Sequence, residues 1–419
     1  MTQQQESFLG DIVGIDDKAL ESIDAPRTFN RRTALLSLAS IAGVGALGYF
    51  RGSEIWKMVE RDVLEVPAAI RESYRETGST KDVVVPSHNQ YPYPASTMET
   101  YAAEETRLFP ERSGAMMAVT IATNIANRVA LQSRALVQDS SNNDQLSFSE
   151  CFQELAQSKD GLNSYMRLIA YELIRAGCFY KIEGSLDSAV DSSKHLDSKF
   201  HLDCDLLCHV ALHCASRHDM PLEAIKAPSH MYIGSPHYQD YAIEMTAFRG
   251  EQRTSIDGLK RKTFTAIGES YFTSQRSQQM YFNSLSSTEA ERLGYFLPLS
   301  FNQIQESAVG NLLVELLMES LQAKDPTQLS FLCAVADREL RRFHGGELVT
   351  QNVYAVHSLA RDYYLNQWLA EKTDLEAHDR ALFHARSIER IKSNYGDRLI
   401  TSQDQDDRAK LERLTQSPD

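Results

Sequence analysis

The stretch from residue 203 to residue 246 constrains the fold more than any other part of the chain. Asp203 is a favourable helix N-cap residue, and the apolar period after it predicts a helix with Cys204 in its first turn. Three short runs with β-strand character follow, at residues 222–227, 230–234 and 241–246. A helical period also covers residues 162–176. Residues 145–250 therefore predict an α+β unit.

Beyond residue 300 the apolar pattern is helical. The expected helices cover residues 303–323, 328–343, 353–370 and 375–394. Pro326 and the pair Gly345 and Gly346 punctuate them, and such short connections favour antiparallel neighbours. We therefore expect residues 301–398 to be an array of helical hairpins, followed by a flexible tail over residues 399–419.

The region before the α+β unit has two parts. Apolar residues recur every three or four positions over residues 113–137, which predicts an amphipathic helix. Residues 53–112 contain five prolines and several tyrosines, which is typical of an extended connector after one short helix near residues 54–76. The sequence thus predicts a linker over residues 53–112 and a folded domain over residues 113–300.

The amino-terminal region carries a targeting pattern. Residues 33–50 are uncharged and lie between Arg31 and Arg32 on one side and Arg51 on the other, which predicts an export signal or a membrane anchor over residues 31–52. Residues 30–36 resemble a twin-arginine translocation signal. A buried core helix is the alternative. Residues 1–30 are mostly acidic and polar, and we expect a disordered leader there.

Composition limits the partners and the class of protein. Lys and Arg number 43 against 57 Asp and Glu, and the resulting net charge of −14 makes nucleic acid an unfavourable partner. An apolar content of 42% excludes a wholly disordered chain, and 419 residues allow two or three folded units. No phosphate-binding loop or dinucleotide fingerprint is present, so no cofactor is expected.

Three side chains in this order carry the candidate chemistry: Cys204, His230 and Glu244. A thiol nucleophile needs an imidazole to remove its proton, and the imidazole needs a carboxylate to fix its orientation. The start of a helix favours the thiolate form of Cys204. The neighbouring carboxylates of Asp203 and Asp205 favour the protonated thiol, so the sequence does not decide which form of Cys204 predominates.

A metal site is the rival interpretation of the same stretch. Seven potential ligands lie within residues 201–218: His201, Cys204, Cys208, His209, His213, Cys214 and His218. On a helix Cys204 and Cys208 lie about 40° apart, whereas His209 and His213 lie about 140° and 180° from Cys204. One ion cannot be bound from both faces. Cys208 and Cys214 share one face of the helix with Leu207, Ala211 and Ala215, so both are expected in the core. A disulfide among Cys151, Cys178 or Cys333 stays open.

Together these motifs resemble the transglutaminase-like superfamily, and most closely its bacterial SirB-like branch. The resemblance rests on the Cys204 helix, the Met220-Pro221 turn that ends it, the Pro228-x-His230 strand and the Glu244-x-Thr246 strand. Residues 266–272 and 294–300 fit the same branch. Asp219 stands where a glycine is usual, and Glu244 where the wider superfamily commonly has Asp. Residues 354–364 and 381–391 weakly resemble a tetratricopeptide unit.

The resemblance implies a papain-like α+β fold, with the cysteine helix packed on a small antiparallel sheet and a tetratricopeptide-like helical region after it. It implies thiol-mediated acyl transfer or amide hydrolysis on a peptide or protein, with Cys204, His230 and Glu244 as the catalytic residues. The targeting pattern would place such a protein at the bacterial inner membrane or in the periplasm. The alternative is an inert scaffold, tethered to the membrane through residues 33–50, whose carboxy-terminal helices bind a protein partner.

Overall fold

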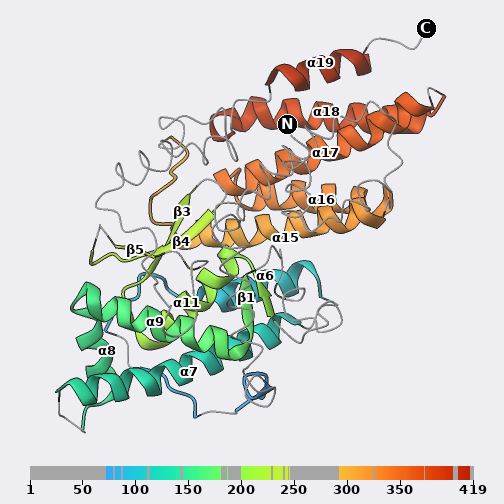
Figure 1. Ribbon diagram of the computed structural model, residues 1–419. Coiled ribbons are helices and arrows are strands. Elements are labelled where there is room, and N and C mark those ends of the chain that lie inside the picture. The colour runs from blue at the N-terminus through green and yellow to red at the C-terminus, as the bar shows by residue number, and fades with distance from the viewer. Residues whose placement is uncertain are drawn as a thin grey trace, which may run out of the picture. The chain divides into compact units, whose positions relative to one another are not determined.

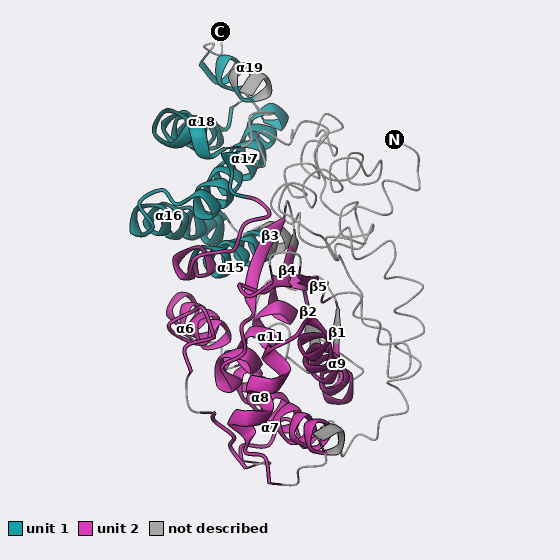
Figure 2. Cartoon of the chain, turned by 90° about the vertical axis from the view of Figure 1, so that its left-hand side faces the viewer, with its two compact units in different colours: residues 1–43, 272–294, 306–419 teal, residues 44–271, 295–305 magenta. Residues whose placement is uncertain are grey.

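The computed structural model describes fourteen parts of the chain: residues 72–78, 81–85, 88–110, 114–141, 145–180, 186, 200–227, 230–238, 241–243, 245, 292–323, 326–371, 373–399 and 404–415. The expected leader, the signal or anchor at residues 31–52 and the motif at residues 266–272 lie outside them. The chain divides into unit 1, residues 1–43, 272–294 and 306–419, and unit 2, residues 44–271 and 295–305 (Figure 2). None of the described helices is long and apolar enough to cross a membrane.

Unit 2 is built around one buried helix, α11 (Cys204–His218). Thirteen of its fifteen residues are buried. The structure also describes in this unit the helices α6 (Thr97–Leu108), α7 (Gly114–Ser141), α8 (Phe148–Ala156) and α9 (Lys159–Ala176). Because α6, α7, α9 and the strands β2, β3 and β4 all contact α11, the helix that carries Cys204 forms the centre of the core (Figure 1). The helices expected over residues 113–137 and 162–176 are confirmed as α7 and α9.

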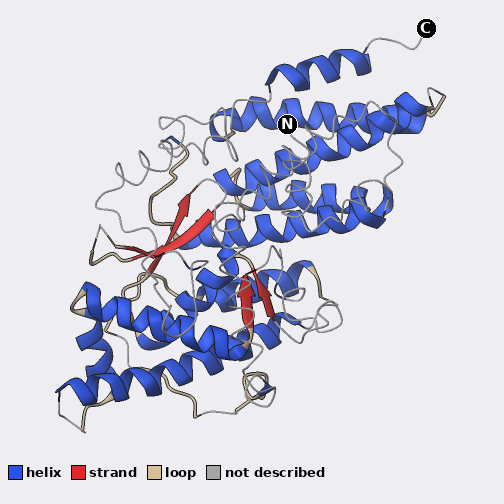
Figure 3. Cartoon of the chain, viewed as in Figure 1, coloured by secondary structure: helices blue, strands red, loops and turns tan. Residues whose placement is uncertain are grey.

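A small antiparallel sheet covers one side of α11. It contains β3 (Glu223–Ala227), β4 (His230–Gly234) and β5 (Ala242–Ile243), in that order (Figure 3). Ala227 pairs with His230, and Ile233 pairs with Ile243. The first two expected strands are confirmed, and the third in part. A mostly helical chain with this sheet agrees with the α+β prediction.

Two further β-features of unit 2 were not predicted. β1 (Cys178–Tyr180) and β2 (Phe200–Leu202) form a parallel pair. Residues 295–299 run along β3, where the amide of Phe296 donates to the carbonyl of Lys226 (2.6 Å) and the amide of Leu299 donates to that of Ala224 (2.9 Å). The motif at residues 294–300 therefore contributes to the edge of the sheet.

The linker expected over residues 53–112 is wrong for its described part. The ring of Tyr74 is fully buried, and its hydroxyl donates to the Glu172 carboxylate on α9. The amide of Val83 donates to Asn127 Oδ1 on α7 (2.8 Å), and α6 packs on α11. The tyrosines that suggested a connector instead fill the core, where aromatic rings bury much apolar surface. Unit 2 thus extends well before residue 113.

Asp219 stands where the resemblance in the sequence would favour a glycine. It caps the carboxyl end of α11 with a left-handed backbone (φ 53°), a conformation that glycine adopts most readily and Asp tolerates. Its carboxylate accepts hydrogen bonds from the amides of His88, Gln90 (3.1 Å) and Tyr91 (3.0 Å). A glycine would supply the turn but could not hold this segment.

Unit 1 is a layer of helices. α15 (Phe301–Ala323) leads into it, followed by α16 (Pro326–Arg342), α17 (Glu347–Ala370) and α18 (Leu375–Tyr395), and then by the short 3₁₀ turn η3 (Gly396–Arg398) and α19 (Asp404–Thr415). α17 lies between α16 and α18 and packs on both (Figure 1). The four helices expected from the apolar pattern are confirmed, although α17 begins at Glu347 rather than Val353.

The flexible tail expected over residues 399–419 is wrong for residues 404–415, which form α19. Asp407 is buried and accepts hydrogen bonds from Arg361 Nη1 on α17 (2.5 Å) and from the Tyr354 hydroxyl, and it pairs with Lys392 Nζ on α18 (2.9 Å). The charges of this segment suggested solvent exposure. They have partners of opposite charge instead, which the linear sequence does not reveal.

Candidate functional site

Cys204 occupies the position that the sequence predicted. Asp203 is the N-cap of α11, and its carboxylate accepts a hydrogen bond from the amide of Leu206 (2.7 Å). This cap holds Cys204 in the first turn of the helix, next to the backbone N–H groups that have no partner within the helix. The predicted local structure around the thiol is therefore confirmed.

The environment of the thiol is closed. Cys204 has no exposed surface, and its thiol donates to Asp205 Oδ1 (3.4 Å). Burial, followed by the negative charges of Asp205 and Asp203, raises the pKa of the Cys204 thiol well above its usual range. Burial and the two carboxylates therefore outweigh the effect of the helix start, and the Cys204 thiol stays protonated.

The helix that carries Cys204 rests on β4. The Cys208 thiol donates to the carbonyl of Met231 (3.5 Å), and the backbone of Met231 also hydrogen-bonds to Cys204. Met231 directly follows His230, the first residue of β4. The structure therefore brings the backbone of the predicted base close to the predicted nucleophile. The His230 side chain and Glu244 lie outside the described residues.

The histidines of α11 are core residues with separate partners. His213 is hydrogen-bonded through Nδ1 to Ser96 Oγ (2.7 Å) and through Nε2 to Thr123 Oγ1 (3.1 Å). His218 is hydrogen-bonded to the Tyr165 hydroxyl (2.8 Å) and stacks on Phe152. Because these nitrogens face hydroxyl groups, they do not form a shared set of metal ligands.

Burial keeps His209, His213 and His218 of α11 neutral. It lowers the pKa of His209 to about 4 and the pKa values of His213 and His218 to about 3. His209 meets the Tyr101 ring edge-on, and neither of its ring nitrogens has a hydrogen-bond partner among the described residues. Their uncharged state agrees with a place in the hydrophobic core.

The cysteines follow the core prediction. Cys208 and Cys214 are fully buried on α11. All six cysteines lie in the described residues, and none of them forms a disulfide. The disulfide considered among Cys151, Cys178 and Cys333 is therefore absent from this arrangement.

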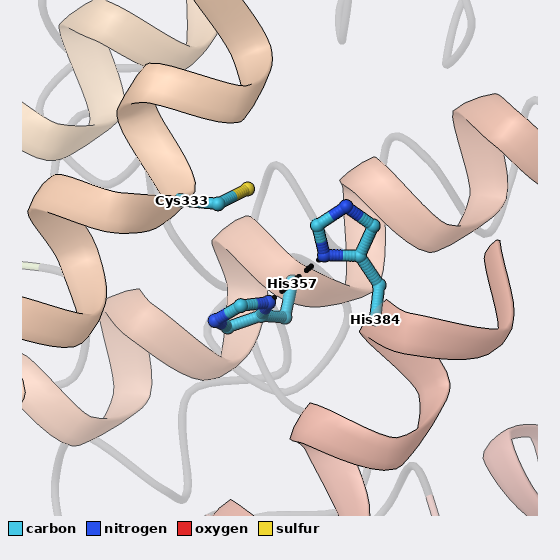
Figure 4. Close-up of side chains that lie close together, drawn as sticks. All are labelled: Cys333, His357 and His384. Atoms are coloured by element: carbon cyan, nitrogen blue, oxygen red, sulfur yellow. Dashed lines mark hydrogen bonds between the residues drawn. The ribbon is translucent and has the colours of Figure 1, made fainter. Parts of the chain in front are cut away.

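A second cluster, which the sequence did not predict, lies in unit 1. Cys333 on α16, His357 on α17 and His384 on α18 each place one potential ligand atom within 4.8 Å of the other two, and all three side chains are buried (Figure 4). Each residue comes from a different helix, so no local spacing in the sequence announces the group. The antiparallel packing of the three helices brings it together.

An open pocket of about 620 Å³ reaches this cluster from between α16 and α18. Cys333, Asp337 and His384 line it, together with Glu376, Asp379 and Arg380 near the start of α18. The cluster is thus connected to solvent, although its own side chains are buried.

The comparisons with known proteins add no family to this geometry. No protein-family model, no curated protein and no solved structure matches the chain.

Proposed function

We propose that unit 2 is a transglutaminase-like domain with a papain-like core and that Cys204, His230 and Glu244 are its acyl-transfer site. The observation that supports this best is the capped helix start of α11, which sets Cys204 against the strand that His230 begins. A cysteine at a helix start beside a histidine-bearing strand is the arrangement that thiol acyl transfer needs.

In the proposed reaction His230 takes the proton of the Cys204 thiol, and the thiolate attacks an amide carbonyl of a peptide or protein. The carbon–nitrogen bond breaks, the amine leaves with the proton from His230, and a thioester remains on Cys204. Water then gives hydrolysis, and a second amine gives transfer. Glu244 orients His230, and backbone amides at the start of α11 stabilise the oxyanion.

Burial of the thiol favours a second candidate function. Cys204 has no exposed surface and a raised pKa, which is typical of an inert core cysteine. The domain would then be a scaffold, held at the bacterial inner membrane by residues 31–52. Exposed Phe331 on α16 and Phe383 on α18 are suited to contact a protein partner of the helical region.

Labelling with iodoacetamide separates the two candidates. If Cys204 is a nucleophile, mass spectrometry of the folded protein finds it labelled faster than Cys178, which is equally inaccessible and has no base assigned to it. The His230→Ala variant should slow labelling of Cys204 at least tenfold, and the control variant His237→Ala, at an exposed histidine just after β4, should not.

Equal, slow labelling of Cys204 and Cys178 in the wild-type protein would remove the acyl-transfer proposal. If the domain is a scaffold, the Phe331→Ser, Phe383→Ser double variant should no longer bind a partner that the wild-type chain captures. The Cys204→Ser variant should still bind that partner.

A further inference from the structure

The cluster in unit 1 contains a chain of contacts that fixes the state of His357. Its Nε2 lies 3.3 Å from Asp337 Oδ1. On the other side of the ring, its Nδ1 lies 3.0 Å from His384 Nδ1, the contact dashed in Figure 4. The same carboxylate oxygen lies 3.6 Å from Arg390 Nη2. Asp337 is therefore placed to accept the Nε2 proton of His357.

This assignment leaves the Nδ1 lone pair of His357 directed at the centre of the cluster. A histidine that donates one ring N–H to a carboxylate and turns its other nitrogen to a common point has the pattern of a metal ligand. The carboxylate fixes the tautomer and increases the basicity of the ligating nitrogen. His213 on α11 lacks this feature, because both of its partners are hydroxyl groups.

His384 and Cys333 supply two further ligand atoms. His384 is held by stacking on the Tyr364 ring, and its Nδ1 faces the Nδ1 of His357. A tetrahedral zinc ion places two histidine nitrogens about 3.3 Å apart and a sulfur about 3.6 Å from each nitrogen. The nitrogens are already 3.0 Å apart, and a thiol within 4.8 Å needs only a small side-chain movement.

The surroundings favour a dication that remains accessible. Asp337, Glu376 and Asp379 bring negative charge to the pocket at the cluster. The single cation among the residues that line this pocket, Arg380, pairs with Glu376 and donates to the Tyr364 hydroxyl (3.0 Å). Since Cys333 and His384 both face the pocket, a fourth coordination position would open toward solvent.

We propose that Cys333, His357 and His384 form a zinc site with its fourth position open to the pocket between α16 and α18. One thiolate and two imidazoles are a ligand set that zinc prefers, and three protein ligands with one open position are typical of zinc sites that bind water or a substrate. The site does not depend on the acyl-transfer proposal, because it lies in the other unit.

Binding releases one proton, because zinc takes the thiolate form of Cys333 and displaces the thiol proton into solvent. The Nδ1 proton that His384 shares with His357 passes to His384 Nε2, so that the Nδ1 atoms of both rings can bind the ion.

The test uses the full chain, freed of metal with a chelator and titrated with Zn²⁺ by calorimetry. Wild-type protein should bind one Zn²⁺ per chain. Cys333→Ser and His384→Gln should each weaken binding at least 100-fold, and Asp337→Asn should weaken it 10- to 100-fold. The control variant Glu389→Gln changes an exposed carboxylate of α18 that does not line the pocket and should bind with a Kd within threefold of wild type.

Absence of binding by the wild-type protein would overturn the proposal, and so would unchanged binding by Cys333→Ser. If the buried variants fail to fold, Co²⁺ added to wild-type protein gives the answer without them. A thiolate-to-cobalt charge-transfer band together with the strong visible absorption of tetrahedral Co²⁺ is expected, and weak octahedral absorption alone would overturn the proposal.

Discussion

Helices α11 and α17 are both buried, yet they keep polar groups in the core by opposite means. On α11 the buried histidines are neutral and meet hydroxyl groups or aromatic rings. On α17 the polar groups meet charged partners: Arg361 donates to Asp362 (2.8 Å) and to Asp407 (2.5 Å), and His357 faces the Asp337 carboxylate. A hydroxyl accepts either histidine tautomer, whereas a carboxylate selects one. The group that is hydrogen-bonded to the ring therefore distinguishes a histidine that only packs in the core from one that can bind a metal ion.

The contributions of α11 and of the α17 network to stability should respond very differently to acid. The histidines of α11 have folded-state pKa values of about 3 to 4, below the ordinary value of 6.5. The stability they contribute is complete above about pH 6.5 and is lost as the pH falls toward 4 and below. Glu223, whose pKa burial raises to about 7, acts in the opposite direction but is one group against three.

Unit 1 should resist acid over the same range. Burial raises the pKa of Asp407, but Arg361, Lys392 and Tyr354 lower it more, so its contribution persists until the pH falls below about 3.8. One histidine there, His384, behaves like those of α11. Hydrogen-exchange protection at pH 4.5 relative to pH 7 should fall in peptides from α11 before it falls in peptides from α17. The reverse order would contradict the comparison.

Removal of one charge from the α17 network should have the next largest effect. Asp407→Asn leaves Arg361 buried with a single carboxylate partner and should lower the free energy of unfolding by about 3 kcal/mol, because an uncompensated buried charge is costly. Urea denaturation followed by circular dichroism measures this loss. Glu412→Gln, at an exposed position of α19, is the control and should change stability by about 0.5 kcal/mol or less. Equal effects of the two variants would show that the network contributes little.

The smallest effect tests a single hydroxyl partner on the neutral side. Ser96 caps α6 and also bonds His213, whereas Ser147 caps α8 without a histidine partner. Ser147→Ala should cost about 1 kcal/mol for the lost cap, and Ser96→Ala about 2 kcal/mol, because it also leaves a buried imidazole nitrogen without its partner. Equal losses by chemical denaturation would mean that the His213 bond adds no stability.

Local signals were sufficient to predict the elements. The Asp203 cap, the apolar periods and the β-like runs predicted α11, the helices of unit 1 and the strands β3 and β4. They were insufficient where a segment depends on distant partners. Tyr74 and Asp407 both look like surface residues in the sequence, and each is buried by a partner far along the chain, Glu172 or Arg361.

The same distinction holds for the sites. The placement of Cys204 in a helix start beside the strand of His230 could be predicted, because it depends on a cap and on strands close in sequence. The closure of the thiol and its raised pKa could not, since they arise from packing around α11. The cluster of Cys333, His357 and His384 could not be predicted either, because it joins three helices whose mutual register is set by their packed faces.

The hydrogen bonds from backbone amides in residues 88–91 to the Asp219 carboxylate limit where the chain can be truncated. A gene cut at residue 113, the boundary that periodicity suggests, would encode a product without Tyr74, Tyr101 and the amides that satisfy Asp219. Glu172 on α9 would lose its bond from Tyr74, Asp219 would lose the amides that it binds, and the space of two buried tyrosine rings would be empty, so such a product should collect in inclusion bodies. A start upstream of Tyr74 keeps those groups satisfied.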